Sequence, residues 1–354
     1  MNKNISIHKN NFDLLRLFAS FLVVYGHAYP LTGNPSPSFM GNSVQAIGIK
    51  IFFVISGYLV MSSWQRDPSV YRFLIRRGLR IVPALVVLIV LSIVLIGPVF
   101  SQLGIHEYFS NGRAWSYLSN IALYIQYDLP GVFLNNPYPV AVNGSLWSLP
   151  IEVVMYLIGP LAWSLGFLFF RRGVFGITLA ALGLMIFSHY FLRIQAVPPA
   201  TVIYGSSVAS FLDVSPYFLF GGVISLARFE KVLNIQLALF VWCAISLIKL
   251  PADMSEIALW FVLTYVVLSF GLAQSRAGDW LTSKGDISYG VYLYGFPVQQ
   301  GVSMLLPIAF LGPWVNFLIA LPIVIVLSVF SWKLVERPVL KLKPGKIHAP
   351  LSSS

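Results

Sequence analysis

The sequence has little charge. Of its 354 residues, only 10% are Asp, Glu, Lys or Arg, whereas 57% are hydrophobic. A soluble domain averages about 25% charged residues. Several runs of twenty residues or more carry no charge, for example 81–100 and 311–332. Such runs are long enough to cross a bilayer as helices. The sequence therefore predicts an all-α, polytopic membrane protein, and we expect one integral membrane domain over 1–354.

Cysteine and acidic residues are also scarce. The single Cys243 lies in an apolar run, which excludes a disulfide framework and cysteine metal sites, and we expect no metal. The 12 acidic residues against 23 Lys and Arg give a net charge of +11. Loop charges of a membrane protein explain this better than nucleic-acid binding, so no nucleic-acid partner is expected. Arg16 interrupts the first apolar region, which argues against a cleavable signal peptide.

Ten apolar stretches are predicted to span the membrane. Together they cover about 12–334 and leave a short tail at 335–354. Their approximate limits are 12–30, 43–64, 81–100, 147–169, 174–194, 209–227, 233–249, 256–273, 288–309 and 313–334.

The basic residues are unevenly distributed between the two sides that these spans define. With the N-terminus in the cytoplasm, nineteen of the 23 Lys and Arg fall on the cytoplasmic side. The exceptions are Lys50, Arg113, Arg193 and Lys249. Cytoplasmic loops of membrane proteins are enriched in Lys and Arg. We therefore predict that both termini are cytoplasmic.

The first span, NFDLLRLFASFLVVYGHAYP, carries three ionisable residues. Asp13, Arg16 and His27 fall on one face of a helix, with Arg16 about 16 Å from His27 along the axis. Ionisable groups within a span are costly and usually face a protein interior or a cavity. One interpretation is that the first two are interfacial anchors and His27 a structural histidine. The other is that this face marks two sites, a charged pair near one end and an imidazole near the other.

A run of arginines precedes the third span, in RDPSVYRFLIRRGLRIVP. Arg72, Arg76 and Arg80 are four residues apart and share a helix face, with Arg77 beside them. Topogenic charge alone explains such a run. The alternative is a phosphate-binding site, because guanidinium groups match phosphate oxygens.

The segment 101–144 is neither a clean span nor plainly soluble, and it is rich in aromatic residues. These side chains favour either anchoring at the membrane interface or packing against sugar rings. They are Trp115, Tyr117, Tyr124, Tyr127 and Tyr138.

The fourth span opens with NGSLWSLPIEVVMY, which includes Ser145, Trp147, Ser148 and Glu152. Glu152 is a carboxylate within a span and has no basic neighbour in sequence. Its partner must come from another helix, or it must be protonated. Because this span and the first both approach from the outer side, a pairing of Glu152 with His27 is expected.

Taken in order, these landmarks resemble the acyltransferase 3 family of integral membrane acyltransferases, over nearly the whole chain. The landmarks are DLLRLFASFLVVYGH, FFVISGYL, RRGLRIVPAL, NGSLWSLPIEVVMY, ISYGVYLYGFP and VERP. The resemblance implies an enzyme of a bacterial-type plasma membrane. It would transfer acetyl from acetyl-CoA to a hydroxyl of an envelope carbohydrate, free or lipid-linked, such as O-antigen or exopolysaccharide.

The resemblance also implies roles for single residues. Arg16 and His27 match the family's essential pair, Glu152 its acidic position, and Arg77 and Arg80 its basic motif. Many members carry a histidine two residues before the proline of the ninth span, where this chain has Gly295.

These observations give a hypothesis for the reaction. His27 and Glu152 are the expected catalytic residues, with His27 acting either as general base or as an acetyl carrier. A pantetheine arm is roughly as long as the separation of Arg16 and His27. The expected substrate-binding residues are Asp13, Arg16, Arg77, Arg80, Ser145 and Trp147.

Two other functions compete with acetyl transfer. A membrane transporter or flippase for a lipid-linked or sugar substrate would also need ionisable groups within its spans. The sequence lacks the inverted repeat common in transporters. A scaffold for envelope-building enzymes would leave these groups without a use.

Overall fold

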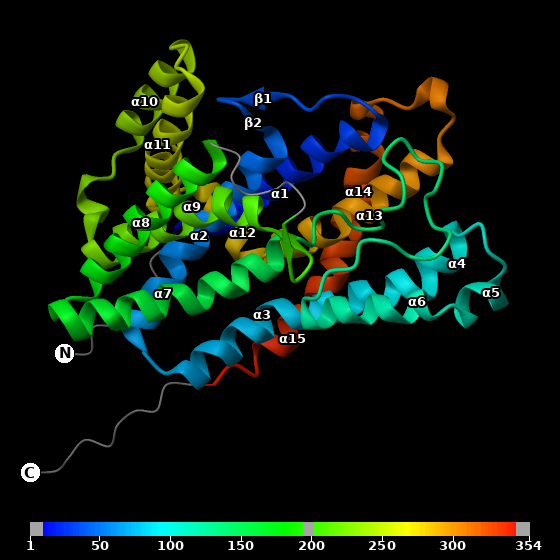
Figure 1. Ribbon diagram of the computed structural model, residues 1–354, viewed down its shortest axis with the longest axis horizontal. Coiled ribbons are helices and arrows are strands. Elements are labelled where there is room, and N and C mark those ends of the chain that lie inside the picture. The colour runs from blue at the N-terminus through cyan, green and yellow to red at the C-terminus, as the bar shows by residue number, and fades with distance from the viewer. Residues whose placement is uncertain (1–9, 194–200, 345–354) are drawn as a thin grey trace, which may run out of the picture.

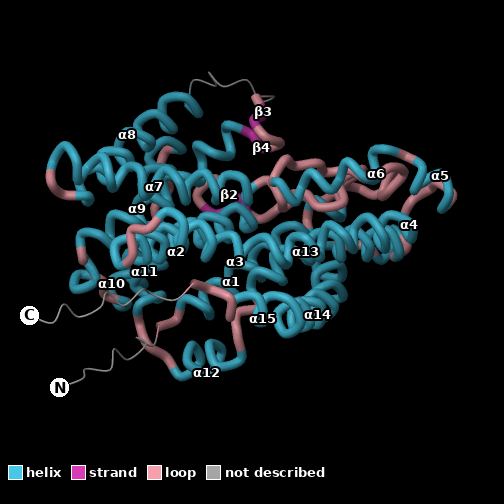
Figure 2. Tube along the Cα trace, turned by 90° about the horizontal axis from the view of Figure 1, so that it is seen from below, coloured by secondary structure: helices cyan, strands magenta, loops and turns pink. Residues whose placement is uncertain are grey.

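The computed structural model describes residues 10–193 and 201–344, which are almost entirely helical (Figures 1 and 2). The predicted all-α class is confirmed. Half of the predicted tail, residues 345–354, lies outside the described residues, as does the side chain of Arg193. Two short antiparallel pairs are the strands of the described part: β1 (Ser38–Phe39) with β2 (Asn42–Ser43), and β3 (Val202–Ile203) with β4 (Ser206–Ser207).

In the described ranges, eight helical segments are long and apolar enough to cross a membrane. The protein is a multi-pass membrane protein. The segments are Phe12–Thr32, Val44–Arg66, Val70–Phe100, Ser148–Phe170, Gly173–Tyr190, Val208–Ala227, Met254–Leu272 and Pro313–Leu340.

The number of candidate spans is therefore smaller than the ten predicted. The other two predicted spans form α10 (Ile235–Leu247), of only 13 residues, and α13 (Ser288–Leu305). Helix α13 packs inside the protein, where fourteen of its residues are buried. It can therefore carry polar side chains that find partners within the bundle. Its Gln299, for example, donates through Nε2 to the carbonyl of Val24 at 2.8 Å. Polar groups satisfied inside the bundle lower the apolar character by which spans are recognised.

The remaining elements follow the predicted order. The long helices are α1 (Phe12–Ala28), α2 (Val44–Arg66), α3 (Val70–Leu91), α7 (Ser148–Phe170), α8 (Gly173–Arg193), α9 (Val208–Ala227), α11 (Ala252–Leu272) and α14 (Pro313–Ser331). The short ones are α4 (Gly97–Phe100), α5 (Ile105–Ser110), α6 (Gly112–Ser116), α12 (Arg276–Lys284) and α15 (Arg337–Leu340). Single 3₁₀ or π turns are η1 (Pro30–Thr32), η2 (Ser92–Ile96), η3 (Tyr117–Ala122), η4 (Phe229–Val232), η5 (Ile308–Phe310) and η6 (Trp332–Glu336).

Helix α3 begins at Val70, eleven residues before the predicted limit of the third span. The arginine run therefore forms the first turns of the helix. At its start, Asp67 accepts hydrogen bonds from Arg72 at 2.6 Å and from Arg76 at 2.8 Å. These two bonds hold the pKa of Asp67 well below its usual range. Arg72 and Arg76 are thus already paired within the protein.

Helices α2 and α9 approach each other closely through glycine. A Cβ on Gly57 would lie 1.8 Å from the carbonyl oxygen of Phe218, and one on Gly221 would lie 2.3 Å from that of Val54. No other residue type fits at such contacts without moving a backbone. This seam holds α2 rigidly, and α2 forms one wall of the site described below.

The described chain begins and ends at the same end of the bundle. Helix α12 lies against the start of α1, where Thr282 donates to Asp13 at 2.9 Å. Near the last described residues, burial and the positive charges of Arg80 and Arg77 lower the pKa of Lys343. The segment 101–147, with α5 and α6, lies toward the right of Figure 1.

Candidate active site

Two neighbouring cavities lie inside the bundle, and Ile49 of α2 lines both. The first, here called the arginine cavity, measures about 80 Å³, and the second, the histidine cavity, about 700 Å³. The arginine cavity is lined by Arg16, Ser56, Arg77, Arg80, Ser148, Glu152, Tyr156, Ser288, Tyr289 and Tyr292, among others. The histidine cavity is lined by His27, Gln45, Tyr127, Asp128, Tyr138, Gly144, Trp147, Ser207, Ser210 and Phe296, among others.

Asp286 organises the cations of the arginine cavity. Its Oδ2 accepts a hydrogen bond from Arg80 and lies 3.4 Å from Nη1 of Arg16. Its Oδ1 accepts from the backbone N–H of Ser288 at 3.0 Å, which fixes the carboxylate at the start of α13. Burial alone would raise the pKa of Asp286, but the charges of Arg80 and Arg16 hold it well below its usual range. The carboxylate therefore stays ionised and joins α1, α3 and α13.

The charged pair predicted near the start of the first span is confirmed. Arg16 Nη1 lies 3.2 Å from Oδ1 of Asp13. Asp13 is not among the residues that line the arginine cavity, whereas Arg16 is. Asp13 therefore contacts Arg16 from outside the cavity and helps to fix its position.

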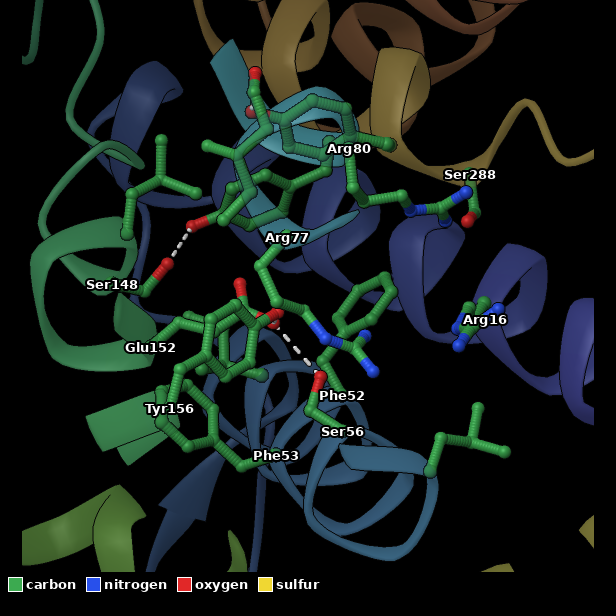
Figure 3. A pocket seen from close by; sticks show the side chains of 16 residues that line it. Arg16, Phe52, Phe53, Ser56, Arg77, Arg80, Ser148, Glu152, Tyr156 and Ser288 are labelled. Atoms are coloured by element: carbon green, nitrogen blue, oxygen red, sulfur yellow. Dashed lines mark hydrogen bonds between the residues drawn. The ribbon is translucent and has the colours of Figure 1, made fainter. Parts of the chain in front are cut away.

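Arg77 is the arginine of the α3 run that pairs with no carboxylate in the described part of the chain. Its guanidinium lies 5.5 Å from the ring centre of Phe73 and 5.4 Å from that of Tyr156. Aromatic faces attract cations. Figure 3 shows the Arg77 side chain reaching into the arginine cavity between Glu152 and Arg16. This cation is held in place without being neutralised by an ion pair.

The expected pairing of Glu152 with His27 is wrong for this structure. The Glu152 carboxylate accepts hydrogen bonds from Ser56 at 2.8 Å and Tyr156 at 2.5 Å, inside the arginine cavity (Figure 3). Trp147, directly before the first residue of α7, lines the histidine cavity together with His27. Glu152 lies five residues, or about 7.5 Å, further along the helix. It therefore reaches the other cavity.

A chain of hydroxyl groups lies at one side of the arginine cavity. The Tyr292 hydroxyl donates to the carbonyl of Ser145 and lies 2.5 Å from Oγ of Ser148. Because a phenol has one proton, Ser148 must donate to Tyr292. Ser145 itself is buried and donates through Oγ to Asn143 at 2.6 Å. It lines neither cavity and instead supports Tyr292.

His27 lies in the histidine cavity with its ring edge-on to Phe296, at 5.3 Å between ring centres. Among the described residues, no hydrogen bond or ion pair engages its ring nitrogens. They are therefore available to a substrate. At Gly295, beside Phe296, a Cβ would lie 2.7 Å from the side chain of Val24 on α1. The close approach of α13 to α1 thus explains why glycine occupies this position.

Four of the five aromatic residues singled out in segment 101–144 fit one of the two predicted roles. Tyr127 and Tyr138 line the histidine cavity, as sugar packing requires. Burial raises the pKa of Tyr127 to about 12, so its hydroxyl stays protonated, and it donates to the carbonyl of Gly205 at 2.7 Å. Trp115 and Tyr124 are exposed, as interfacial anchors would be. Tyr117 is fully buried and takes neither role.

Sequence reasoning missed several residues of the site. Asp286 reads as an ordinary polar residue before a helix, and Tyr156 and Tyr292 read as packing residues. Their partners lie far away along the chain. A signal did exist for Asp286, because an acidic residue directly before a span must find a cation when it is buried.

The two cavities differ in the ligands they can hold. The arginine cavity offers cations to an anionic substrate, as arginine forks do in other proteins. The histidine cavity combines aromatic rings with polar groups and has the size of an ordinary small-molecule site. In the part of the chain that the structure describes, no cluster of three or more His, Cys, Asp or Glu side chains is placed to bind a metal.

An acyltransferase domain model matches residues 9–333 of the chain. The chain belongs to the acyltransferase 3 family. This confirms the resemblance that the sequence landmarks indicated and the prediction that the protein is an O-acetyltransferase. It also decides against a transporter or a scaffold as the primary function.

Curated relatives align over most or nearly all of the chain. An O-acetyl transferase of Shigella phage Sf6 is 30% identical over 96% of this chain and 99% of its own length. Nodulation protein 10 of Rhizobium leguminosarum bv. viciae is 30% identical over 99% of this chain and 98% of its own. Peptidoglycan O-acetyltransferase OatA of Listeria monocytogenes is 25% identical over 83% of this chain and 51% of its own. No solved structure matches the protein.

Proposed function

We propose that the protein transfers an acetyl group from acetyl-CoA, bound from the cytoplasm, to a hydroxyl of an envelope carbohydrate. The observation that carries this proposal is that two chemically different cavities lie side by side, with Ile49 lining both. One cavity is lined by arginines and the other by aromatic side chains, and Arg16 and His27 place them about 16 Å apart along α1. A transfer between two chemically different substrates needs such an arrangement.

The donor would occupy the arginine cavity. Arg16, Arg77 and Arg80 line it, against the carboxylates Glu152 and Asp286. The local excess of positive charge favours an anionic ligand. Because the cavity measures about 80 Å³, it suits the narrow thioester arm, while the nucleotide stays at the end where α3 begins. Arg77 is the proposed phosphate or carbonyl contact because it forms no ion pair with any of the residues that the structure describes.

The acceptor would occupy the histidine cavity. Its volume of about 700 Å³ suits a sugar ring. Tyr127, Tyr138 and Trp147 would pack against the ring, and Asp128 would accept hydrogen bonds from its hydroxyl groups. Envelope carbohydrates as acceptors agree with the similarity to OatA, a peptidoglycan O-acetyltransferase.

In the proposed reaction, His27 takes the proton of the acceptor hydroxyl through a ring nitrogen. The oxygen then attacks the thioester carbonyl, the carbon–sulfur bond breaks, and the imidazolium returns the proton to the departing thiolate. Atoms and charge balance without a further reactant. A neutral imidazole suits this exchange near pH 7. Direct transfer is preferred to an acetyl-histidine because His27 lies on the side of the acceptor.

The proposal is tested with the purified protein in proteoliposomes and acetyl-CoA labelled in the acetyl group. We expect label to pass to glycan on the far side of the membrane. In cells, deletion of the gene should remove one acetyl group from an envelope glycan by mass spectrometry. Unchanged glycan mass together with unused acetyl-CoA would refute the proposal.

A further inference from the structure

An apolar groove lies between α7, α8 and α9 and ends at the β3–β4 hairpin. We call it the hairpin groove. It measures about 610 Å³, and its lining includes Ile151, Val154, Leu184 and Phe211. Helix α8 contributes to this groove and to neither of the two cavities of the candidate active site. The side chain of Val154 is 42% exposed. Because these helices are candidate spans, we expect the groove to face the hydrocarbon of the membrane.

The hairpin groove adjoins the histidine cavity. Ser207, in β4, lines both. Two hydrogen bonds fasten the hairpin to residues of that cavity: Tyr127 donates to the carbonyl of Gly205 at 2.7 Å, and Ser206 donates to that of Trp147 at 2.8 Å. The β3–β4 hairpin, which lies between the groove and the cavity, is therefore held in place by specific hydrogen bonds.

Gly205 allows the hairpin to sit this close. Its φ is +76°, which few side chains tolerate. A Cβ there would lie 2.6 Å from the carbonyl oxygen of Ile125. The groove, the hairpin and the segment before α7 thus form one packed unit.

A second apolar groove provides the comparison. It lies between α3, α13 and α14, measures about 420 Å³, and includes Leu91, Val298 and Leu327 in its lining. We call it the α14 groove. It shares no lining residue with either of the two cavities. Bulk lipid can fill both grooves, but only a chain in the hairpin groove would end beside the proposed acceptor site.

We propose that the hairpin groove holds the hydrocarbon chain of a lipid-linked glycan whose sugar enters the histidine cavity. This inference rests on the proposed function and narrows its acceptor class to glycans still joined to their membrane carrier. Such a glycan brings a hydrocarbon chain and a sugar to the same place.

The groove would favour acetyl transfer by positioning the sugar and not by adding hydrophobic binding energy. A lipid chain gains no hydrophobic energy by leaving the bilayer, since membrane lipid is as apolar as the groove. Seating the chain instead raises the effective concentration of the attached sugar at His27. Blocking the groove should therefore weaken use of the lipid-linked acceptor and leave acetyl-CoA binding unchanged.

The first experiment uses undecaprenyl phosphate with a photoreactive diazirine in its chain, added to the full-length protein in phosphatidylcholine nanodiscs. We expect mass spectrometry to find the label on α7, α8 and α9. Unlabelled undecaprenyl phosphate should displace it, and an equal amount of phosphatidylglycerol should not. Equal labelling of the α14 groove, or equal displacement by phosphatidylglycerol, would overturn the inference.

The second experiment fills each groove. Leu184→Trp on α8 should reduce groove labelling about tenfold, as the loss of a positioned tether does. Leu327→Trp on α14 is the matched control. It fills the α14 groove and should leave labelling of the hairpin groove unchanged. Both helices lie outside the two cavities. If Leu184→Trp does not fold, Val154→Trp serves in its place. Unchanged labelling in a folded groove variant would contradict the inference.

Acetyl transfer by the wild-type protein separates the two levels of the argument. Transfer from labelled acetyl-CoA without any groove labelling would overturn the lipid-linked acceptor and leave the proposed function standing. Absence of any use of acetyl-CoA would overturn both.

Discussion

Arg16 and His27 lie eleven residues apart on α1 and line two different cavities, with Ile49 of α2 on the boundary between them. Eleven residues are slightly more than about three helical turns, so both side chains point to the same side of α1 about 16 Å apart. One helix therefore serves both ends of the site. Arg16 is held by Asp13 and Asp286, while His27 has no hydrogen-bonding partner among the described residues. The fixed cation and the free imidazole suit binding and proton transfer respectively.

Topology gives the first prediction. The start of α1 and Lys343 lie at the same end of the bundle, and the unequal distribution of Lys and Arg predicts that this end is cytoplasmic. Single cysteines introduced at Ser354 and Pro137, after replacement of Cys243, should react differently with a membrane-impermeant reagent in intact cells. Only the cysteine at 137 should be labelled. Labelling at 354 would reverse the orientation and the direction proposed for the donor.

Asp286 gives the second prediction. Asp286→Asn keeps the size of the side chain but removes the charge that holds Arg16 and Arg80. We expect the KM for acetyl-CoA to rise about 10- to 100-fold, the effect of about 1.5–3 kcal/mol per lost charge-assisted contact. The KM for the acceptor should hardly change. Thermal stability of the purified variant is the control.

Two further results bear on the role of Asp286. Asp286→Glu should recover part of the donor affinity, which a purely structural defect would not do. Because the pKa of Asp286 is held well below its usual range, the group contributes stability above its unfolded pKa and loses it only in strong acid. The wild-type KM for acetyl-CoA should therefore be flat between about pH 5 and 8 as far as this residue is concerned. Equal losses for donor and acceptor in Asp286→Asn would contradict a positioning role.

Asp286 also illustrates the limit of sequence reasoning. The pair Asp13–Arg16 and the common face with His27 follow from helix periodicity, because those residues are close in sequence. Asp286 is separated from Arg80 by 206 residues and from Arg16 by 270, so only the tertiary fold brings them together. The same holds for Glu152. The sequence shows that it lies in a span, but which cavity it lines depends on the depth at which α7 packs. Helix α13 was found, but its burial within the protein was not.

Glu152 gives the third prediction. It shares the arginine cavity with Arg77 and not the histidine cavity with His27. In double-mutant cycles, Glu152→Gln should therefore couple to Arg77→Lys and be nearly additive with His27→Gln in kcat/KM. Ser56→Ala removes one hydrogen bond to Glu152 and should cost a smaller factor, about 5- to 10-fold. A strong coupling of Glu152 to His27 would support the pairing expected from sequence and contradict the arrangement described here.

His27 gives the last prediction. Removing a positioned general base costs about 10²- to 10⁴-fold in rate, so His27→Ala should lose acetyl transfer to that extent. Its binding of acetyl-CoA should survive, because the arginine cavity does not include His27. The replacement is apolar and half-buried in a span, so insertion and thermal stability should be retained.

His27→Gln, similar in size and polarity but unable to take the proton, is the matched control and should be equally inactive. Transfer and donor binding are measured on the same purified variant. If wild-type enzyme and labelled acetyl-CoA form a stable acetyl-protein at His27 without acceptor, direct transfer is wrong and a covalent relay replaces it. A stable His27→Ala protein with full activity would end the catalytic assignment.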